Sequence, residues 1–301
     1  MTEPGGTGRT SVVIAAHNEE AVIGRCLDAL LADPGPAGVD ITVVANGCTD
    51  ATAAVAGSRP GVRVIDRPEQ GKPGALNAGD AVAVGFPRVY LDADIVLPPG
   101  AVRVLAEALN RPDDAGTAPL AVVPRRQLDL ARRPLLVRAY FAINARLPAY
   151  DRALFGRGAI VLSARGRARF AGFPDMIADD LYLDSLFTWD ERREISAVTA
   201  TVATPRHTRD LVRRLVRVRA GNAAMREAAV RGDVPAGVRR SARASWLRDV
   251  VLPRPWLAPA AVCYVVITIV AALLASGRRD AGAWARDESS RRATHEATAG
   301  R

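Results

Sequence analysis

Short β-rich runs alternate with helical patterns over the first 125 residues, and this alternation constrains the fold more than any other feature of the chain. Strands are predicted at Ser11–Ala16, Val39–Ala45, Val62–Ile65, Arg88–Leu91 and Ala118–Val123. Runs of this kind that alternate with helices form parallel sheets with helices on their faces. We therefore expect an α/β fold with a mostly parallel, Rossmann-like sheet flanked by helices.

Beyond a Pro- and Arg-rich stretch, Pro124–Pro134, the alternation gives way to a mixed pattern. The further elements expected are an amphipathic segment at Leu135–Asn144, a strand at Gly158–Ser163, a helix from Asp179 through Trp189 and an Arg-rich helix at Thr208–Gly221. Early in the chain, Asn18 is expected to cap a helix that begins at Glu19 and Glu20. Thr49 or Asp50 is expected to cap the next one.

Near the other end, Trp256–Ala275 is a run of 20 residues without a charge. About 20 apolar residues suffice to cross a bilayer as a helix. The run predicts one transmembrane helix, with a buried core helix as the alternative. Arginines before Trp256 favour a cytosolic location for the part of the chain that precedes the run, although Arg278 and Arg279 weaken this argument. Because no leader precedes the first strand, the amino-terminal part is also expected in the cytosol.

The net charge of +9 comes almost wholly from arginine, since Lys72 is the only lysine among 41 basic residues. The arginines are spread out and only 5% of residues are aromatic, which argues against a base-stacking surface for nucleic acid. Anionic lipid or a phosphorylated substrate fits better. The cysteines, at positions 26, 48 and 263, are too far apart to suggest a disulfide framework or a zinc site.

Three polar clusters follow predicted strands: Ala16–Glu19, Asn46–Asp50 and Asp92–Asp94. The ligand crevice of a parallel sheet lies at the carboxyl ends of its strands. The clusters are therefore expected to meet at one edge of the sheet. Taken singly, each also fits a turn or a helix start.

Asp92 and Asp94 are two positions apart, so in an extended segment both carboxylates point to the same side. Oxygen ligands suit Mg²⁺ or Mn²⁺, which keep waters and bind through one or two carboxylates plus substrate phosphates. The alternative is an Asx turn before Pro98 and Pro99.

Glycines and a lysine fill the segment Gln70–Gly79, just before a predicted helix. A helix amino terminus with a nearby ammonium is a natural diphosphate site. The Walker spacing is absent, and the early Gly-x-Gly at Gly6 and Gly8 precedes its strand, which weakens nucleotide-hydrolase and dinucleotide readings. Chance placement of the single lysine is the alternative.

These four motifs, in this order, resemble those of the family-2 glycosyltransferases, which have the GT-A fold. The resemblance implies a sugar transfer from a nucleotide-diphosphate sugar to a hydroxyl acceptor with inversion of configuration. By this resemblance, the residues that bind the nucleotide sugar are His17, Glu19, Asn46, Asp50, Lys72, Asn77 and Asp92. Asp94 is implied to bind a divalent metal, Mg²⁺ or Mn²⁺.

Later segments resemble the acceptor side of the same family: Gly158–Ser163, Gly172–Pro174 and Ala178–Leu181. There an acidic pair starts a helix. The resemblance implies that Asp179 and Asp180 are catalytic and that Asp180 removes the proton of the acceptor hydroxyl. The alternative is simple capping of the helix dipole by the two acids.

The chain also departs from the family pattern. His17 replaces an aromatic residue, typically Tyr, and Asn46 replaces an Asp that reads the base, so a uridine donor is not implied. The Gln-x-x-Arg-Trp signature is missing. Arg217 and Arg219 are the candidates for a comparable acceptor-side or phosphate-side role, and the alternative is a helix on the membrane surface held by anionic lipid.

The sequence thus predicts a membrane-anchored, metal-dependent glycosyltransferase of cell-envelope glycan or glycolipid synthesis, single-pass, with its catalytic domain in the cytosol. One span cannot form an export channel, so transfer of one or few sugars is expected. The expected regions are a nucleotide-sugar half (1–125), an acceptor-side half (126–222), a basic linker (223–255), a transmembrane helix (256–275) and a polar, disordered tail (276–301). The rivals are a noncatalytic nucleotide-sugar-binding membrane scaffold and a sugar-phosphate nucleotidyltransferase, whose Gly-rich loop after the first strand is absent.

Overall fold

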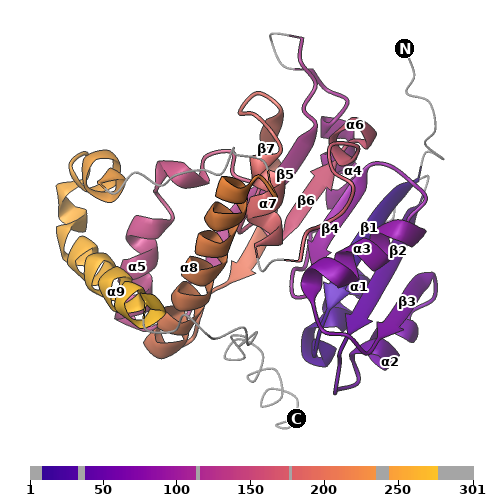
Figure 1. The fold of residues 1–301 in the computed structure, drawn as a ribbon, viewed down its shortest axis with the longest axis horizontal. Coiled ribbons are helices and arrows are strands. Elements are labelled where there is room, and N and C mark those ends of the chain that lie inside the picture. The colour runs from indigo at the N-terminus through magenta and orange to yellow at the C-terminus, as the bar shows by residue number, and fades with distance from the viewer. Residues whose placement is uncertain (1–8, 33–37, 113–115, 176–177, 235–243, 277–301) are drawn as a thin grey trace. The chain divides into compact units, whose positions relative to one another are not determined.

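A computed structural model describes residues 9–32, 38–112, 116–175, 178–234 and 244–276 (Figure 1). Its elements are β1 (Thr10–Ala16), α1 (Glu20–Ala32), β2 (Val39–Asn46), α2 (Thr52–Gly57), β3 (Val62–Arg67), α3 (Lys72–Val82), β4 (Arg88–Asp92), α4 (Ala101–Ala108), β5 (Ala121–Asp129), α5 (Leu135–Asn144), η1 (Pro148–Tyr150), β6 (Ala159–Leu162), α6 (Ala164–Arg167), α7 (Asp179–Ser185), β7 (Arg192–Ala203), α8 (Thr208–Arg231), η2 (Trp246–Val251), η3 (Pro255–Leu257) and α9 (Ala258–Ser276).

The chain divides into two compact units. Unit 1 contains the residues up to Gln127 together with Leu154–Val202. Unit 2 contains Leu128–Ala153 and the residues from Ala203 onward. The mixed sheet belongs to unit 1 except for the last residues of β5 and β7, and the helices α5, α8 and α9 belong to unit 2.

Within the described residues, the sheet has seven strands in the order β3-β2-β1-β4-β6-β5-β7 (Figure 1). Strands β1 to β4 pair in parallel, whereas β6 runs antiparallel to β4 and β5. Ala16 pairs with Ala45, and Ala15 pairs with Asp92. The carboxyl ends of β1, β2 and β4 therefore lie at one edge, and the expected mostly parallel sheet with flanking helices is confirmed.

Helices cover both faces of the parallel strands, which explains why β1 reads Val12-Val13-Ile14 without a polar break. On one face, Val12 and Ile14 share a core with Ile23 of α1 and Leu105 of α4. Each of these side chains is fully buried. Such burial stabilises the fold by about 1.5–3 kcal/mol for a side chain of this size.

Helix α3 packs on the other face, where Gly79 lets it approach the sheet closely. A Cβ at Gly79 would lie 2.5 Å from Cγ1 of Val13 and 3.1 Å from Cγ2 of Val44. Side chains cannot be accommodated at the first distance without a shift of the helix. The close contact holds α3, and with it Lys72 in its first turn, against β1 and β2.

The strands predicted for the first 125 residues all occur, but β7 was not predicted. Its charged start, Arg192 to Glu194, hides the strand pattern. In the structure these charges have partners, since Arg192 pairs with Asp184 and Glu194 pairs with Arg157. Helix α7 ends at Ser185, before the predicted end at Trp189.

Asn18 does not cap α1 as predicted. The backbone N–H groups of Val22 and Ile23 donate to the carbonyl of Glu19, so Glu19 occupies the N-cap position. The side-chain oxygen of Asn18 instead accepts from the backbone N–H of Thr49 at 2.8 Å. Asn18 thus joins the loop after β1 to the loop after β2.

Unit 2 is built on α5, α8 and α9, which share a core that includes Tyr140, Leu211 and Ile267. The rings of Tyr140 and Tyr264 stack with their centroids 5.2 Å apart. In the described part of the chain, one helical stretch, Pro255–Ser276, is long and apolar enough to cross a membrane. Much of the expected linker is helical, because α8 extends to Arg231 and η2 follows. The expected tail lies outside the described residues apart from Ser276.

Candidate functional site

A pocket that is partly open to solvent lies in unit 1 at the carboxyl end of β4. The chemically distinctive residues of its wall come from α3, β4, the loop before α7 and α7 itself. They are Lys72, Tyr90, Asp92, Phe173, Asp179 and Asp180. Residues expected on the donor side and on the acceptor side therefore line the same pocket.

Lys72 bridges two carboxylates in this pocket. Its Nζ lies 2.7 Å from Oδ1 of Asp92 and 2.9 Å from Oδ2 of Asp179. Burial lowers the pKa of Lys72, but the Asp179 and Asp92 carboxylates outweigh this effect and hold the pKa well above its usual value. Lys72 is therefore a fixed cation between the end of β4 and the start of α7.

Asp180 lies beside this bridge and is held by backbone donors. Its Oδ2 accepts from the N–H of Gly156 at 3.0 Å, and its Oδ1 accepts from the N–H of Leu181 at 2.8 Å. Burial and the neighbouring Asp179 carboxylate raise the pKa of Asp180 to about 6, although Lys72 opposes the shift. A carboxylate with this pKa is ionised at neutral pH and is still able to accept a proton.

Asp184, one turn after Asp180, supports the same loop and was not identified from the sequence. It is 2% exposed, its Oδ1 accepts from the N–H of Leu154 at 2.9 Å, and it pairs with Arg192. Two acids four positions apart on α7 thus hold the backbone of Leu154 and Gly156. The available signal was an aspartate that follows the apolar residues Leu181–Leu183 of α7.

Asn46 and His17 lie at the ends of β2 and β1. Asn46 is buried, its Nδ2 donates to the carbonyl of Ala16 at 2.7 Å, and its Oδ1 accepts from the N–H of Gly71 at 3.1 Å. The side chain of Asn46 therefore fixes the loop that precedes Lys72. His17 is oriented by a 2.6 Å contact between its Nδ1 and the carbonyl of Asn46.

Asp50 and Glu20 tie the first turns of α1 and α2 together. Asp50 accepts from the backbone N–H of Glu20 at 3.2 Å, and Glu20 accepts from that of Ala51 at 2.8 Å. Asp50 also accepts from the N–H of Thr52 at 3.0 Å, close to its predicted capping role. The N–H of the buried Glu19 donates to the Thr52 hydroxyl at 2.7 Å.

Asp92 is the last residue of β4, but Asp94 lies in a turn rather than in an extended segment. The turn is closed by the N–H of Ile95, which donates to the carbonyl of Asp92 at 3.1 Å. The side chain of Asp94 is exposed, and both carboxylates raise the pKa of the buried Cys26 thiol, after the larger effect of burial.

The carboxylates of Asp92 and Asp94 fit a hard divalent cation for which the protein supplies only some of the ligands. Among the described residues, no group of three or more His, Cys, Asp or Glu side chains could hold a metal ion by itself. Mg²⁺ and Mn²⁺ bind through one or two carboxylates and take their other ligands from water and substrate phosphates. Asp92 and Asp94 meet that requirement, with Asp94 the more accessible of the two.

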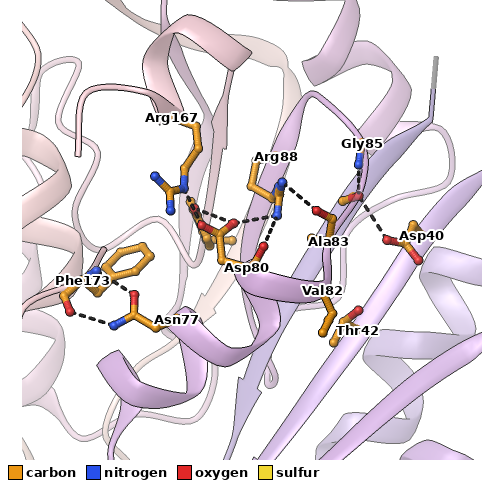
Figure 2. A network of polar contacts seen from close by, with 12 residues as sticks. Asp40, Thr42, Asn77, Asp80, Val82, Ala83, Gly85, Arg88, Arg167 and Phe173 are labelled. Carbon is orange, nitrogen blue, oxygen red and sulfur yellow. Dashed lines mark hydrogen bonds and ion pairs between the residues drawn. The ribbon is translucent and has the colours of Figure 1, made fainter. Parts of the chain in front are cut away.

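Asn77 contacts the backbone of the Gly172–Pro174 segment, which the family resemblance predicts to be on the acceptor side. Its Nδ2 donates to the carbonyl of Phe173 at 2.9 Å, and its Oδ1 accepts from the N–H of Phe173 at 2.7 Å (Figure 2). The Phe173 ring meets that of Tyr90 edge to face, with centroids 5.0 Å apart. Asn77 thus joins α3 to the Gly172–Pro174 segment and sets the position of one aromatic wall.

One turn further along α3, Asp80 is the centre of an ion-pair cluster that sequence reasoning missed. It accepts from Nη1 of Arg88 at 2.6 Å, from the Tyr90 hydroxyl at 3.2 Å and from Arg167 (Figure 2). Arg167 also stacks over the Phe170 ring at 4.2 Å. The partners are separated by as many as 87 positions in the chain, so no local pattern reveals them.

Arg217 and Arg219 lie on α8 of unit 2. Nη2 of Arg219 donates to the carbonyl of Thr268 in α9 at 3.2 Å. Their contact with substrate stays a prediction.

A sequence profile described as "Glycosyl transferase family 2" matches residues 11–161. Among solved structures, a mannosyltransferase from Pyrobaculum calidifontis, PcManGT in complex with GDP-Man and Mn²⁺, is 23% identical, with a TM-score of 0.57 over 99% of this chain and 88% of that chain. S. aureus TarS 1-349 in complex with UDP-GlcNAc is 14% identical, with a TM-score of 0.50 over 89% of this chain and 92% of that chain. None of the curated proteins compared matches the sequence. The expected GT-A type fold is confirmed.

Proposed function

The chain belongs to glycosyl transferase family 2, and we propose that it moves a sugar from a nucleotide-diphosphate sugar to a hydroxyl acceptor with inversion at the anomeric carbon. The main support for this proposal is the pair of contacts that Lys72 makes with two carboxylates. One ammonium contacts both Asp92 at the end of β4 and Asp179 at the start of α7, and Asp180 lies in the same pocket. The nucleotide sugars named with the similar structures, GDP-Man and UDP-GlcNAc, support a donor of this class.

In the proposed reaction, Asp180 is the general base. The acceptor oxygen attacks the anomeric carbon, its proton passes to Asp180, and the bond from the anomeric carbon to the diphosphate oxygen breaks. The N–H groups of Gly156 and Leu181 orient the Asp180 carboxylate, and Asp184 holds the loop that carries one of them. General-base catalysis of this kind contributes a factor of about 10²–10⁴ to the rate.

Lys72 is proposed to stabilise the negative charge of the departing diphosphate. It is the cation of the pocket's wall, and it begins a helix whose amino terminus also favours anions. His17 and Glu19, with Asn46 and Asp50 acting through the backbone that they hold, form the proposed nucleoside end. Asp92 is proposed to contact ribose or sugar.

A divalent cation is proposed at Asp94, with Asp92 beside it. When bound, Mg²⁺ or Mn²⁺ would neutralise charge on the diphosphate. The Mn²⁺ complex of the P. calidifontis mannosyltransferase supports the use of a divalent cation.

The proposed setting is the cytosolic face of a membrane, in cell-envelope glycan or glycolipid synthesis with transfer of one or few sugars. Helix α9 supports membrane attachment, since it is long and apolar enough to enter a bilayer. Arg217 and Arg219 are proposed to face the acceptor or its phosphate. The proposed catalytic domain is 1–222 in two halves, 1–125 and 126–222.

The test is release of nucleoside diphosphate from a panel of UDP, GDP and dTDP sugars with and without Mn²⁺. We expect release from one of them only with Mn²⁺, and loss of release in Asp94→Ala. The exposed Asp190→Asn is the matched control. Unchanged turnover in Asp94→Ala would exclude the metal role, and binding without release for every donor would favour a noncatalytic scaffold.

A further inference from the structure

The positive charge of the chain is concentrated in unit 2. This unit has 24 arginines against 10 Asp and Glu, whereas unit 1 has 17 Lys and Arg against 22 Asp and Glu. The net charge of +9 for the whole chain is therefore the sum of a negative charge on unit 1 and a larger positive charge on unit 2. A charge excess of this size draws the unit that carries it towards an anionic partner.

Helix α9 has two different faces. One face packs on α5 and α8 through Ala261, Tyr264, Ile267 and Ala271. The other face is exposed and wholly apolar; it consists of Val262, Val266, Ile269, Val270, Leu273 and Leu274, each 40–68% exposed. These positions recur every three or four residues, so they form one stripe along the helix.

A polar contact lies next to the middle of α9. Nη2 of Arg219 donates to the carbonyl of Thr268 at 3.2 Å. The packing of Leu211, Val212 and Leu215 against the cluster that contains Ile267 keeps the same part of α8 beside the middle of α9. Helix α8 carries seven arginines, and three of them, at positions 213, 214 and 217, lie within this stretch.

This packing conflicts with a simple crossing of the bilayer. A helix of 19 residues is about 28 Å long, so in a span Thr268 would lie near the centre of the hydrocarbon. Arg219 and the adjacent arginines of α8 would be carried to the same depth. Arginine at the bilayer centre is costly, and water at the interface removes that cost.

We propose that unit 2 docks on an anionic lipid bilayer with α9 lying in the plane of the interface, its exposed stripe among the acyl chains and the arginines of α8 at the level of the headgroups. Leu252 and Trp256, which are 66% and 72% exposed just before α9, extend the apolar surface. Trp is a residue typical of membrane interfaces. A nucleic-acid partner would satisfy the charge but leave the apolar stripe in water. The proposal does not depend on the reaction of unit 1.

Topology distinguishes this arrangement from a single span. The full chain is produced with one epitope tag at each end, and protease is added to spheroplasts and to inverted membrane vesicles. We expect both tags to be digested in the inverted vesicles and both to be protected in the spheroplasts. Digestion of the carboxyl-terminal tag in spheroplasts, with the amino-terminal tag protected, would overturn the proposal.

Vesicle binding tests the surface itself. The purified full chain is sedimented with vesicles of phosphatidylcholine, with or without about a third phosphatidylglycerol. We expect binding to need the anionic lipid, to weaken with salt, and to fall at least about tenfold in the double variant Val266→Glu, Ile269→Glu. Val84→Glu, at a 60% exposed valine of unit 1, is the control. Circular dichroism checks that each variant folds. Equal binding by the double variant, or preferential binding to nucleic acid, would overturn the proposal.

Discussion

Helix α3 and strand β4 contribute to two charged clusters that differ in their balance of charge. At the start of α3, Lys72 faces the carboxylates of Asp92 and Asp179, and Asp180 lies beside them. Two turns later, the single carboxylate of Asp80 faces the guanidinium groups of Arg88 and Arg167 (Figure 2). The first cluster has more acids than bases, and the second has more bases than acids.

The clusters also differ in exposure. The side chains of Asp80 and Arg88 are each 5% exposed, whereas those of Lys72 and Asp92 are 30% and 44% exposed. In the buried cluster, Nη1 and Nη2 of Arg88 also donate to the backbone carbonyls of Asp80 and Ala83. In the open cluster, burial and then the Asp179 carboxylate raise the pKa of Asp180. Burial lowers the pKa of Lys72, but the carboxylates of Asp179 and Asp92 outweigh this effect and raise it. We infer that the buried cluster around Asp80 holds the fold, while the acid-rich cluster around Lys72 keeps charge available for a ligand.

The comparison is tested most strongly by Asp180→Asn. Because the amide cannot accept the acceptor's proton, we expect transfer to fall about 10²–10⁴-fold while donor binding is retained. Transfer is measured under single-turnover conditions, and donor binding by calorimetry. Preserved transfer would mean that the base lies elsewhere.

For the buried cluster around Asp80, Asp80→Ala is expected to lower the free energy of unfolding by about 3–5 kcal/mol, because it leaves Arg88 buried without its partner. Urea unfolding of the purified protein measures this change. Glu107→Ala on α4, which breaks exposed pairs with Arg103 and Arg111, should cost less than about 1 kcal/mol. Similar losses for the two variants would remove the distinction between buried and exposed pairs.

Asn77→Ala should have an intermediate effect, because it removes two hydrogen bonds to the backbone of Phe173. We expect a loss of about 1–3 kcal/mol in stability and a higher KM for the acceptor. Donor affinity should change little if Asn77 acts only through Phe173. A loss confined to donor affinity would instead support the donor-binding role of Asn77 predicted from the sequence.

The pH dependence of activity follows from the raised pKa of Asp180. The base works only when ionised, so we expect kcat/KM to be level above the pKa of about 6 and to fall about tenfold per pH unit below it. The profile is measured with the donor saturating. A profile that is level down to pH 4 would contradict a base with a raised pKa.

The same shift predicts a smaller effect on stability. Since the pKa of Asp180 is higher in the folded chain than its ordinary 3.8, its contribution to stability is present below that value and is lost as the pH rises through about 6. The variant Asp180→Asn has no carboxyl group at this position, so it does not lose stability in this way as the pH rises. The variant should therefore gain stability relative to the parent between pH 4 and pH 7, as measured by urea unfolding at both values. No difference between the two pH values would argue against the shift.

The parallel half of the sheet could be predicted from sequence because its strands are short apolar runs that end in polar clusters. Strand β7 could not, since Arg192, Arg193 and Glu194 at its start find partners only in the folded chain. The position of Lys72 before a helix was visible in the sequence. Its bridge to Asp179, more than 100 positions away, was not.

Residue types alone do not show which tertiary contacts a polar side chain makes. Asn18 looked like a helix cap and binds the neighbouring loop instead. Asn77, placed by resemblance among donor ligands, bonds the backbone of Phe173, 96 positions later. The side chain of Asn46 is hydrogen-bonded to the backbone of Ala16 and Gly71. In each case a tertiary hydrogen bond, which no local pattern specifies, decides the contact.

The account rests on the claim that the acid-rich cluster around Lys72 binds the diphosphate of a donor. Calorimetric titration of UDP and GDP, each with and without Mn²⁺, into the parent chain and into Lys72→Met tests it most directly. We predict binding of at least one of the two nucleotides that requires Mn²⁺ and is weakened at least about tenfold, or about 1.4 kcal/mol, in the variant. Equal affinity of Lys72→Met and the parent chain, with the variant shown to be folded by circular dichroism, would contradict the account.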